Sequence, residues 1–348
     1  DFVIHSVNDI LIKEFGRSMS DENIHILDPF TGTGTFITRL LQSGLIKKED
    51  ILRKYTNEIH CNEIVLLAYY IAAVNIENAF HDILGQDASY QTFEGVCLTD
   101  TFQMYESNLG ENYDDDIFSK NSKRIINQQK APLRIIIGNP PYSIGQKSAN
   151  DNAQNQSYPT LDNRISDTYA KNTSVTNKNA LYDSYIKAFR WSTDRLDKTG
   201  GIIAFVSNGA WLDGNSTDGF RKSLEKEFTS IYVFNLRGNA RTSGELRQKE
   251  GGGVFGLGSR TPISITLLVK NPEVESEKAT IHYQDIGDYL DRENKLKIIK
   301  EVKTFANPEF SLTILHSNEH GDWLNHRNDG FSQFISIADK KAKESTIF

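Results

Sequence analysis

The fold of this chain is decided by one stretch near its amino end, Ile24-His25-Ile26-Leu27-Asp28-Pro29-Phe30-Thr31-Gly32-Thr33-Gly34-Thr35-Phe36. Its apolar first part ends in an acid, which predicts a buried strand with a carboxylate at its carboxyl end. The two glycines then allow a ligand to approach the backbone closely before a helix begins. The stretch therefore predicts an α/β fold with a ligand outside the end of this strand.

A dinucleotide-binding fold is the main competitor for any glycine loop. Its fingerprint has a third glycine three positions after the second, where this chain has Ile37. The close contact between helix and strand that this glycine provides is therefore missing. We expect a ligand other than a dinucleotide.

The second informative stretch is the apolar run Arg134-Ile135-Ile136-Ile137-Gly138, followed directly by Asn139-Pro140-Pro141-Tyr142. The run predicts a buried parallel strand, which must stop at the prolines because they lack a backbone N–H. The turn leaves the Asn139 amide and the Pro140 carbonyl free to accept hydrogen bonds beside the Tyr142 ring. These groups suit a planar amine, although Asn-Pro also opens ordinary turns and a tyrosine after prolines also packs in cores.

Strands and helices alternate along most of the chain, which predicts an open sheet covered by helices. The helix at about 65–77 is apolar nearly all round, so we expect it to pack between the sheet and another element. The polar segment 143–180 predicts a mobile lid or disorder, with Tyr158, Arg164 and Tyr169 as residues that would close over a substrate. Expected strands lie at about 24–28, 54–64, 95–101, 134–138, 200–206, 231–236 and 263–269.

Polar residues stand where four of these strands end. In open α/β sheets, ligands bind outside the carboxyl ends of the strands. We therefore expect one crevice to collect Asp28, Glu63, Asp100 and Asn139.

The pattern Asp-Pro-Phe-x-Gly-x-Gly-x-Phe at residues 28–36, together with Asn-Pro-Pro-Tyr at 139–142, resembles the S-adenosylmethionine-dependent amino-methyltransferases of DNA. Residues 60–75 and 234–239 resemble, more narrowly, single-polypeptide restriction-modification enzymes of Type ISP or a Type IIG-like kind. The resemblance covers roughly residues 1 to 270. It implies a Rossmann-like methyltransferase fold, a mixed and mostly parallel seven-stranded sheet with helices on both faces.

The resemblance also implies a cofactor pocket for S-adenosylmethionine. Asp28 would meet the amino group of the cofactor, although it could instead cap the turn near Thr31. Glu63 would hold the ribose hydroxyls, with Glu58 as a rival, and Asp100 would accept from the adenine amine with Phe102 as a stacking neighbour. The remaining expected cofactor residues are Pro29, Phe30, Gly32, Gly34, Phe36 and Thr101.

For catalysis the resemblance implies Asn139, Pro140, Pro141 and Tyr142 as the reacting site. Tyr142 and Phe255 would stack on a flipped-out base, although Phe255 could equally pack in the core. Asparagine at the first position is typical of adenine targets, whereas cytosine targets more often show serine. The expected activity is that of a site-specific adenine DNA-methyltransferase, EC 2.1.1.72. The alternatives are methylation of a release-factor glutamine or an RNA base, and a non-catalytic cofactor-binding module.

The partners implied are double-stranded DNA and nuclease, helicase-like motor and target recognition domains on the same full-length polypeptide. The formal charge of −7 argues against DNA binding over the whole surface, because duplex binding draws on Lys and Arg contacts to phosphates. A local basic stretch is the exception, and it either lines a DNA cleft or is a solvated loop. Its members are Arg237, Arg241, Arg247, Lys249 and Arg260.

We expect a methyltransferase domain at residues 1–272 and, at 273–348, a linker and truncated start of a recognition region, because the composition turns charged after Pro272. Trp323, Leu324 and Arg327 would anchor this tail on a recognition domain.

The longest apolar run, 64–74, is shorter than the ~20 residues that cross a bilayer, which predicts a cytoplasmic protein. The two cysteines cannot form a zinc site by themselves, so no metal is expected. The chain begins inside a predicted helix, so we interpret it as a fragment.

Overall fold

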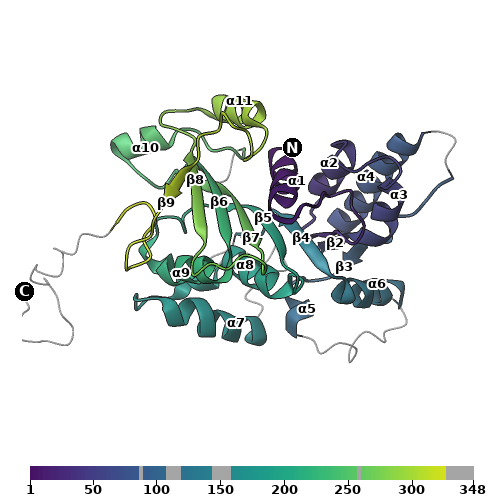
Figure 1. The fold of residues 1–348 in the computed structure, drawn as a ribbon, viewed down its shortest axis with the longest axis horizontal. Coiled ribbons are helices and arrows are strands. Elements are labelled where there is room, and N and C mark those ends of the chain that lie inside the picture. Colours follow the sequence, from purple (N-terminus) through teal and green to yellow (C-terminus); the bar gives the residue numbers. More distant parts are fainter. Residues whose placement is uncertain (86–88, 107–118, 143–157, 257–259, 327–348) are drawn as a thin grey trace, which may run out of the picture.

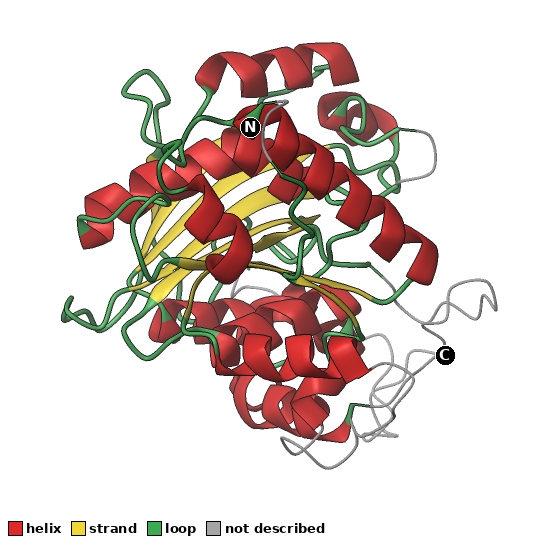
Figure 2. Ribbon diagram, turned by 90° about the vertical axis from the view of Figure 1, so that its right-hand side faces the viewer, coloured by secondary structure: helices red, strands yellow, loops and turns green. Residues whose placement is uncertain are grey.

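A nine-stranded sheet with helices on both faces organises the molecule, as Figures 1 and 2 show. The computed structural model describes residues 1–85, 89–106, 119–142, 158–256 and 260–326. The strands are β1 (His25–Asp28), β2 (Ile59–Glu63), β3 (Val96–Leu98), β4 (Leu133–Gly138), β5 (Gly201–Asn208), β6 (Ser230–Arg237), β7 (Ile263–Lys270), β8 (Thr280–Asp285) and β9 (Thr313–Leu315). The α-helices are α1 (Phe2–Phe15), α2 (Thr35–Gln42), α3 (Ile51–Arg53), α4 (Leu66–Leu84), α5 (Gln103–Glu106), α6 (Ser119–Lys130), α7 (Pro159–Ile165), α8 (Ser184–Arg195), α9 (Asp218–Glu227), α10 (Gly244–Glu250) and α11 (Arg292–Val302).

The strand order β3-β2-β1-β4-β5-β7-β6-β8-β9 places a reversal of the strand order between the parallel neighbours β1 and β4. The first five strands are mutually parallel, and β7 is inserted antiparallel between β5 and β6. Ligands of open α/β sheets bind at such a reversal, at the carboxyl ends of the strands. The expected fold class is confirmed, and β8 and β9 extend the sheet beyond the seven strands expected.

Both faces of the sheet are buried, which explains the uninterrupted apolar run of β4. Ile135 and Ile137 pack with α1, α2 and α4, whereas Ile136 packs with α8 and α9 on the opposite face. All three are at most 2% exposed. A parallel strand covered on both sides has no polar face and therefore no alternation.

The sheet continues past Pro272, where the sequence predicted the end of the methyltransferase domain. β8 pairs in parallel with β6, from Ser230 with Thr280 to Asn235 with Asp285. The charged composition that suggested a boundary belongs to the turn between β7 and β8 and to the exposed side of α11. The division of the chain into two domains stays a prediction.

The tail is anchored differently from what the sequence suggested. Trp323 is buried, its indole Nε1 donates to the Glu225 carboxylate at 2.7 Å, and its ring meets Trp211 edge-on at 5.4 Å. Leu324 packs against the same core. The expectation that they hold a recognition domain is therefore wrong for these two residues, because their partners lie within this sheet-and-helix body. Arg327 lies outside the described residues.

The segment 158–182 is also more ordered than its polarity predicted. α7 buries Leu161 and Ile165, and Tyr169 is 1% exposed with its ring 4.9 Å from Phe220. Arg164 forms an ion pair with Asp194 at 2.8 Å. The interpretation as a lid or disorder is wrong here because helically spaced apolar residues fix the segment against α8 and α9. Residues 143–157 lie outside the described part.

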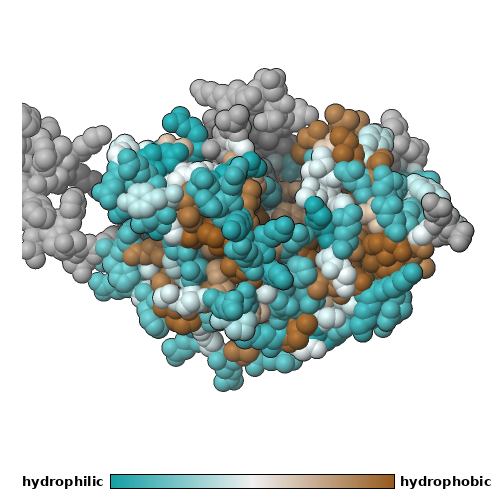
Figure 3. All heavy atoms as spheres, turned by 90° about the horizontal axis from the view of Figure 1, so that it is seen from above, coloured by the Kyte–Doolittle hydropathy of each residue, from teal (hydrophilic) through white to brown (hydrophobic). Residues whose placement is uncertain are grey.

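Helix α4 is buried on one side only, contrary to the expectation for its apolar sequence. Ala72, Ile76 and Phe80 face the sheet, whereas Leu67 is 69% and Val74 is 54% exposed. Figure 3 shows apolar surface on the side of the molecule that carries α2 and α4. Among the described helices, none is long and apolar enough to cross a membrane.

Candidate active site

Asp28 ends β1 beside the reversal point and is completely buried. Its Oδ1 accepts from the Phe30 N–H at 3.1 Å, while its Oδ2 has no hydrogen-bond partner among the described residues. Burial, together with a smaller contribution from the nearby Glu63 charge, raises the pKa of Asp28 to about 7, although the hydrogen bond from the Phe30 N–H opposes the rise. Its bond to Phe30 closes a turn, and α2 begins only at Thr35, so Asp28 does not cap that helix. A buried carboxylate oxygen of this kind needs a donor, and a cationic amine is a suitable one.

The glycine loop after Asp28 needs its glycines for two different reasons. Both have left-handed backbone angles, φ +56° at Gly32 and +85° at Gly34. A Cβ at Gly34 would lie 3.3 Å from the backbone of Ala72, so α4 packs directly on this residue. A Cβ at Gly32 would meet no atom within 4 Å, so this part of the loop is open. The loop is held in place from α4, because Asn75 Nδ2 donates to the Thr33 carbonyl at 2.9 Å.

Glu63 ends β2 and is turned toward this loop. Its two oxygens accept from the backbone N–H groups of Gly32 and Val65, both at 2.7 Å. A carboxylate has about four acceptor positions, so capacity for further donors remains. Glu58 stands at the other end of β2, where it forms ion pairs with Arg53 at 2.8 Å and Lys54 at 2.5 Å. The geometry therefore favours Glu63 over Glu58 as a ligand of the carboxyl edge.

Asp100 follows β3 and has partners on both oxygens. Oδ1 accepts from the Phe102 N–H at 2.9 Å and Oδ2 from the Tyr158 hydroxyl at 2.7 Å. Thr101 is buried, and its hydroxyl donates to the Pro29 carbonyl at 2.6 Å. These contacts tie the end of β3 to the loop after β1. No pattern in the sequence predicted that the hydroxyl of Tyr158, 58 positions away, would donate a hydrogen bond to Asp100.

Aromatic rings close this side of the site. Phe102 is buried between Phe30, at 5.5 Å between ring centroids, and Tyr158, at 5.3 Å. Pro29 is buried, Phe30 is half-buried, and Phe36 packs partly on the core below α2. Phe102 is thus a wall residue, and Phe30 is its more accessible neighbour.

The tetrapeptide follows β4, which is the neighbour of β1 across the reversal point. Asn139 is exposed, and its Oδ1 accepts from the Tyr142 hydroxyl at 2.8 Å. The Tyr142 ring is half-buried against Tyr185, at 6.5 Å and 81°, and burial raises the pKa of Tyr142. Asn139 and Tyr142 are therefore each other's hydrogen-bond partner until another partner enters.

Gly138 is a site residue that the sequence reasoning missed. A Cβ there would lie 3.0 Å from Asp28 Oδ1, so any other side chain would crowd the carboxylate. The available signal was the single glycine between an isoleucine run and Asn139. Gly138 thus brings the stretch after β1 and the tetrapeptide after β4 into contact.

Phe255 lies on the connection from β6 to β7, at the same edge of the sheet, because β6 runs parallel to β5. It is 40% exposed, which argues against core packing. No contact between its ring and that of Tyr142 occurs within the described part of the chain. Its stacking role stays a prediction.

The basic stretch near Phe255 is largely paired within the molecule. Arg237 contacts Asp285 at 2.7 Å and also Asp288, and Lys249 contacts Glu245 at 3.3 Å. Arg247 donates to the Gly251 carbonyl at 2.6 Å. Arg241 and Arg260 are exposed, so the expectation of a DNA cleft now concerns mainly these two. A search of the described residues shows no cluster of His, Cys, Asp and Glu able to hold a metal ion.

Comparison with known proteins gives a family and several close structures. The model of the family "Eco57I restriction-modification methylase" matches residues 47–240, just over half of the chain. No curated protein matches the chain. A solved structure of a nuclease-deletion mutant of the Type ISP restriction-modification enzyme LlaGI, in complex with a DNA substrate mimic, is 47% identical with a TM-score of 0.90.

Two further structures are similar over all of this chain. The ATP-dependent Type ISP restriction-modification enzyme LlaBIII, bound to DNA, is 43% identical with a TM-score of 0.91. DrdV, in a complex with DNA, is 36% identical with a TM-score of 0.86. All three comparisons cover 100% of this chain, but only 28%, 24% and 33% of LlaGI, LlaBIII and DrdV, respectively. The chain thus spans between a quarter and a third of these enzymes.

Proposed function

The chain belongs to the Eco57I restriction-modification methylase family, and on this basis we propose that it methylates the exocyclic 6-amino group of a flipped-out adenine in DNA, with S-adenosylmethionine as methyl donor. The observation that carries the proposal is the placement of Asp28 and Asn139 on the neighbouring strands β1 and β4. Asp28 offers a buried carboxylate oxygen with no partner among the described residues, and Asn139 offers an exposed amide just past the end of the neighbouring strand. This juxtaposition suits a cationic cofactor next to a neutral planar amine.

The residues at this edge fit the cofactor. Asp28 Oδ2 would accept from its ammonium group, the open backbone at Gly32 admits close approach, and Glu63 retains capacity for two ribose hydroxyls. Two residues not foreseen from the sequence complete the fit, because Ile64 and Val65 follow Glu63 directly and are 48% and 53% exposed. They offer an apolar surface for an adenine ring, while Asp100 offers an acceptor for its amine.

Bound S-adenosylmethionine supplies a methyl group attached to a positively charged sulfur. The protein must make the target amine nucleophilic, since the lone pair of an aromatic amine is delocalised into its ring. Asn139 Oδ1 and the Pro140 carbonyl would accept the two amine hydrogens, which localises the lone pair and aims it at the methyl carbon. Transfer would replace the sulfur–carbon bond with a nitrogen–carbon bond and leave the sulfur as a neutral thioether, and the amine would release its surplus proton to solvent.

Tyr142 has two roles in this proposal. Its hydroxyl holds Asn139 Oδ1 before substrate arrives, and the amine takes over that hydrogen bond. Its ring would then stack on the extruded base, with Phe255 as the second ring. Flipping costs a few kcal/mol, and stacking returns roughly 1 to 3 kcal/mol per ring.

The three close structures favour DNA over a release factor or RNA as substrate, because LlaGI and LlaBIII are restriction-modification enzymes and all three are seen with DNA or a DNA mimic. We further propose that double-stranded DNA is the partner of this chain. By the same likeness, nuclease, helicase-like motor and target recognition parts would accompany it on one cytoplasmic polypeptide.

The decisive experiment is transfer of labelled methyl groups to duplex DNA by the full polypeptide and its Asn139→Ala variant, with nucleosides identified by mass spectrometry. We expect 6-methyladenine from the parent. The variant should show a rate about 10²- to 10³-fold lower at unchanged cofactor affinity, because removal of one preorganised polar contact of this kind costs about 3 to 4 kcal/mol. Methylated cytosine, glutamine or RNA as the product would refute the substrate assignment. Near-normal turnover of the variant would refute the role of Asn139.

A further inference from the structure

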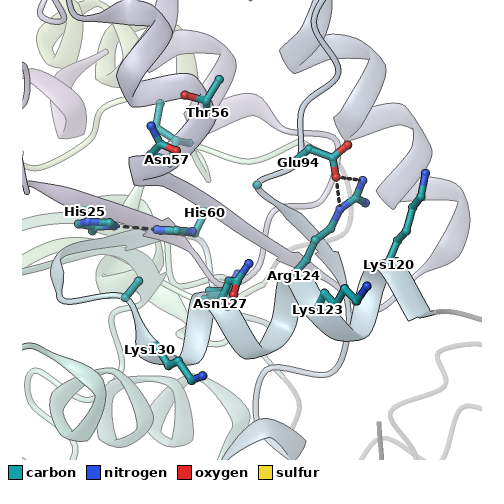
Figure 4. A pocket seen from close by; sticks show the side chains of 14 residues that line it. His25, Thr56, Asn57, His60, Glu94, Lys120, Lys123, Arg124, Asn127 and Lys130 are labelled. Carbon is teal, nitrogen blue, oxygen red and sulfur yellow. Dashed lines mark hydrogen bonds and ion pairs between the residues drawn. The ribbon is translucent and has the colours of Figure 1, made fainter. Parts of the chain in front are cut away.

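A second hollow, of about 640 Å³, lies at the opposite edge of the sheet and is shown in Figure 4. His25 is the first residue of β1 and Ile59 the first of β2, while Gly95 and Ala131 shortly precede β3 and β4. The hollow therefore lies at the amino ends of four parallel strands. The length of a strand, about 13 to 20 Å, separates it from the candidate active site.

One wall of the hollow is a basic stripe along α6. We define the α6 stripe as Lys120, Lys123, Arg124 and Lys130, which together with Asn127 follow helical spacing along one side of the helix. Among the described residues that line the hollow, Glu94 is the only acid, and Arg124 already binds it through Nε at 2.6 Å. Within the described part of the chain the three lysines have no acidic partner, in a protein whose formal charge is −7.

The floor of the hollow adds neutral donors. His25 Nδ1 and His60 Nε2 lie 3.0 Å apart in nearly parallel rings, as the dashed line in Figure 4 marks. Burial lowers the pKa of both histidines, that of His60 to about 3, so both are neutral near pH 7. In either tautomer of the pair, one ring donates to the other and one N–H remains for a ligand. Asn57, Thr56 and Asn127 lie along the same walls.

We propose that this hollow binds backbone phosphates of a nucleic acid, at a place distinct from the edge where the target base would react. Three lysines without an acidic partner among the described residues, several neutral donors, and one described acid already bound to Arg124 match an oxyanion rather than a neutral ligand or a cation. From Lys120 to Lys130 the stripe is about 15 Å long, which corresponds to about four phosphates of one strand. A nucleic acid is favoured over an acidic protein segment because the three similar solved enzymes described above are held on DNA or a DNA mimic.

The inference goes beyond the proposed function, since it does not depend on which base, or whether any base, is methylated. It implies that the protein contacts nucleic acid at both edges of its sheet.

The test compares the full polypeptide with its Lys120→Gln/Lys123→Gln/Lys130→Gln variant. The control is Lys171→Gln/Lys226→Gln/Lys278→Gln, which removes the same charge from exposed lysines elsewhere. Binding of a 40-base-pair duplex without a target site is followed by fluorescence anisotropy between 50 and 200 mM salt. We expect the α6 variant to bind at least 10-fold more weakly and its log–log salt slope to fall by about 2 to 3, since each phosphate contact contributes about 0.9. The control should change by less than 3-fold, and cofactor affinity should be unchanged in both.

A second readout locates the contact. Addition of the duplex should slow amide hydrogen exchange along α6 in the parent and control but not in the α6 variant. An unchanged salt slope in the α6 variant would overturn the proposal. Protection of α6 by inorganic phosphate or a mononucleotide but not by the duplex would also overturn it, and so would protection by poly-glutamate alone. If the triple variant loses cofactor affinity, it is misfolded and its DNA binding is not informative. Single Lys→Gln variants then test the proposal, and each is expected to lower the salt slope by about 0.9.

Discussion

The two edges of one sheet carry opposite chemistry. At the carboxyl edge, β1 and β2 end in Asp28 and Glu63, and Asn139 follows β4. At the amino edge, β1 and β2 carry His25 and His60, and the α6 stripe stands beside them. The acids are buried and one of their oxygens has no partner, whereas the lysines are exposed. The carboxyl edge therefore suits a small cationic ligand enclosed by protein, and the amino edge suits an extended polyanion that stays partly in water.

Position along a strand, more than residue type, distinguishes an acid paired with cations of the protein from one bonded to backbone N–H groups. Glu58 and Glu63 lie five positions apart on either side of β2. Glu58 is neutralised by Arg53 and Lys54, whereas Glu63 contacts only backbone N–H groups. At the amino edge Glu58 is thus paired with cations of the protein, whereas at the carboxyl edge Glu63 has no cationic partner among the described residues.

The largest effect on this contrast is expected from Asp28→Asn. The variant should bind S-adenosylmethionine at least 100-fold more weakly, because an amide replaces the charge that faces the ammonium group. Without cofactor, the same variant should be more stable than the parent above pH 7. The parent's carboxyl group, with a pKa of about 7 when folded and an ordinary value of 3.8, stays protonated in the fold while the unfolded chain ionises. The stabilisation that the protonated Asp28 carboxyl group provides is therefore complete below about pH 4. The free energy of unfolding then falls by up to about 4 kcal/mol as the pH rises to 7.

Calorimetric titration with cofactor, and denaturant unfolding at pH 5 and pH 8, measure both effects. Asp82→Asn is the control, since Asp82 is an exposed acid on α4. Equal stability of parent and Asp28→Asn at pH 8 would show that folding does not raise the pKa of Asp28.

The next largest effect separates the two glutamates. Glu58→Gln should destabilise the protein by about 3 kcal/mol, because it leaves the fully buried Lys54 ammonium without its carboxylate. Its cofactor affinity, measured by calorimetry on the folded protein, should be unchanged. Glu63→Gln should show the reverse, with at least 10-fold weaker cofactor binding and a smaller loss of stability. Loss of cofactor affinity in Glu58→Gln alone would reverse the assignment of these acids.

A smaller effect is expected from pH on cofactor affinity. In the free protein Asp28 must lose its proton to face an ammonium group, so affinity should rise about 10-fold per unit from pH 5.5 toward 7 and then level off. Titration in buffers of different ionisation enthalpy should show uptake of close to one proton by the buffer at pH 6. The Asp28→Asn variant should show a flat profile. A parent profile equally flat between pH 5.5 and 7 would contradict the raised pKa.

Much of the carboxyl edge could be predicted from the sequence because its cues are local. Neighbouring residues determine the strand, acid and glycine loop at 24–36, and they also determine the proline turn after 138. The order of the strands then brings these two stretches together. The hydroxyl of Tyr158 on Asp100 and the crowding of Asp28 by any side chain at Gly138 could not be predicted in the same way, since they depend on distances between separate elements.

The amino edge escaped prediction for a related reason. The stripe on α6 is visible as helical spacing only once residues 119–130 are known to be a helix, and the polar run SKNSKRIINQQK has little apolar periodicity to announce one. The hollow depends on β1 and β2 lying side by side, which places His25 next to His60 across 35 positions. Predictions from composition alone also failed at α4, where an apolar sequence is exposed on one side.

The smallest effects are expected at the exposed side of α4, where this helix borders the carboxyl edge of the sheet. Ile64→Ser should weaken cofactor binding about 5- to 10-fold, the loss for one apolar contact, if its side chain packs on the adenine ring as proposed. Leu67→Ser, one turn further along α4 and 69% exposed, is the matched control. It should leave cofactor affinity unchanged and alter the free energy of unfolding by no more than about 0.5 kcal/mol, since surface substitutions away from special features are nearly neutral. Equal losses of affinity in both variants would mean that the apolar surface acts on the cofactor through α4 as a whole, and the adenine contact would then not belong to Ile64.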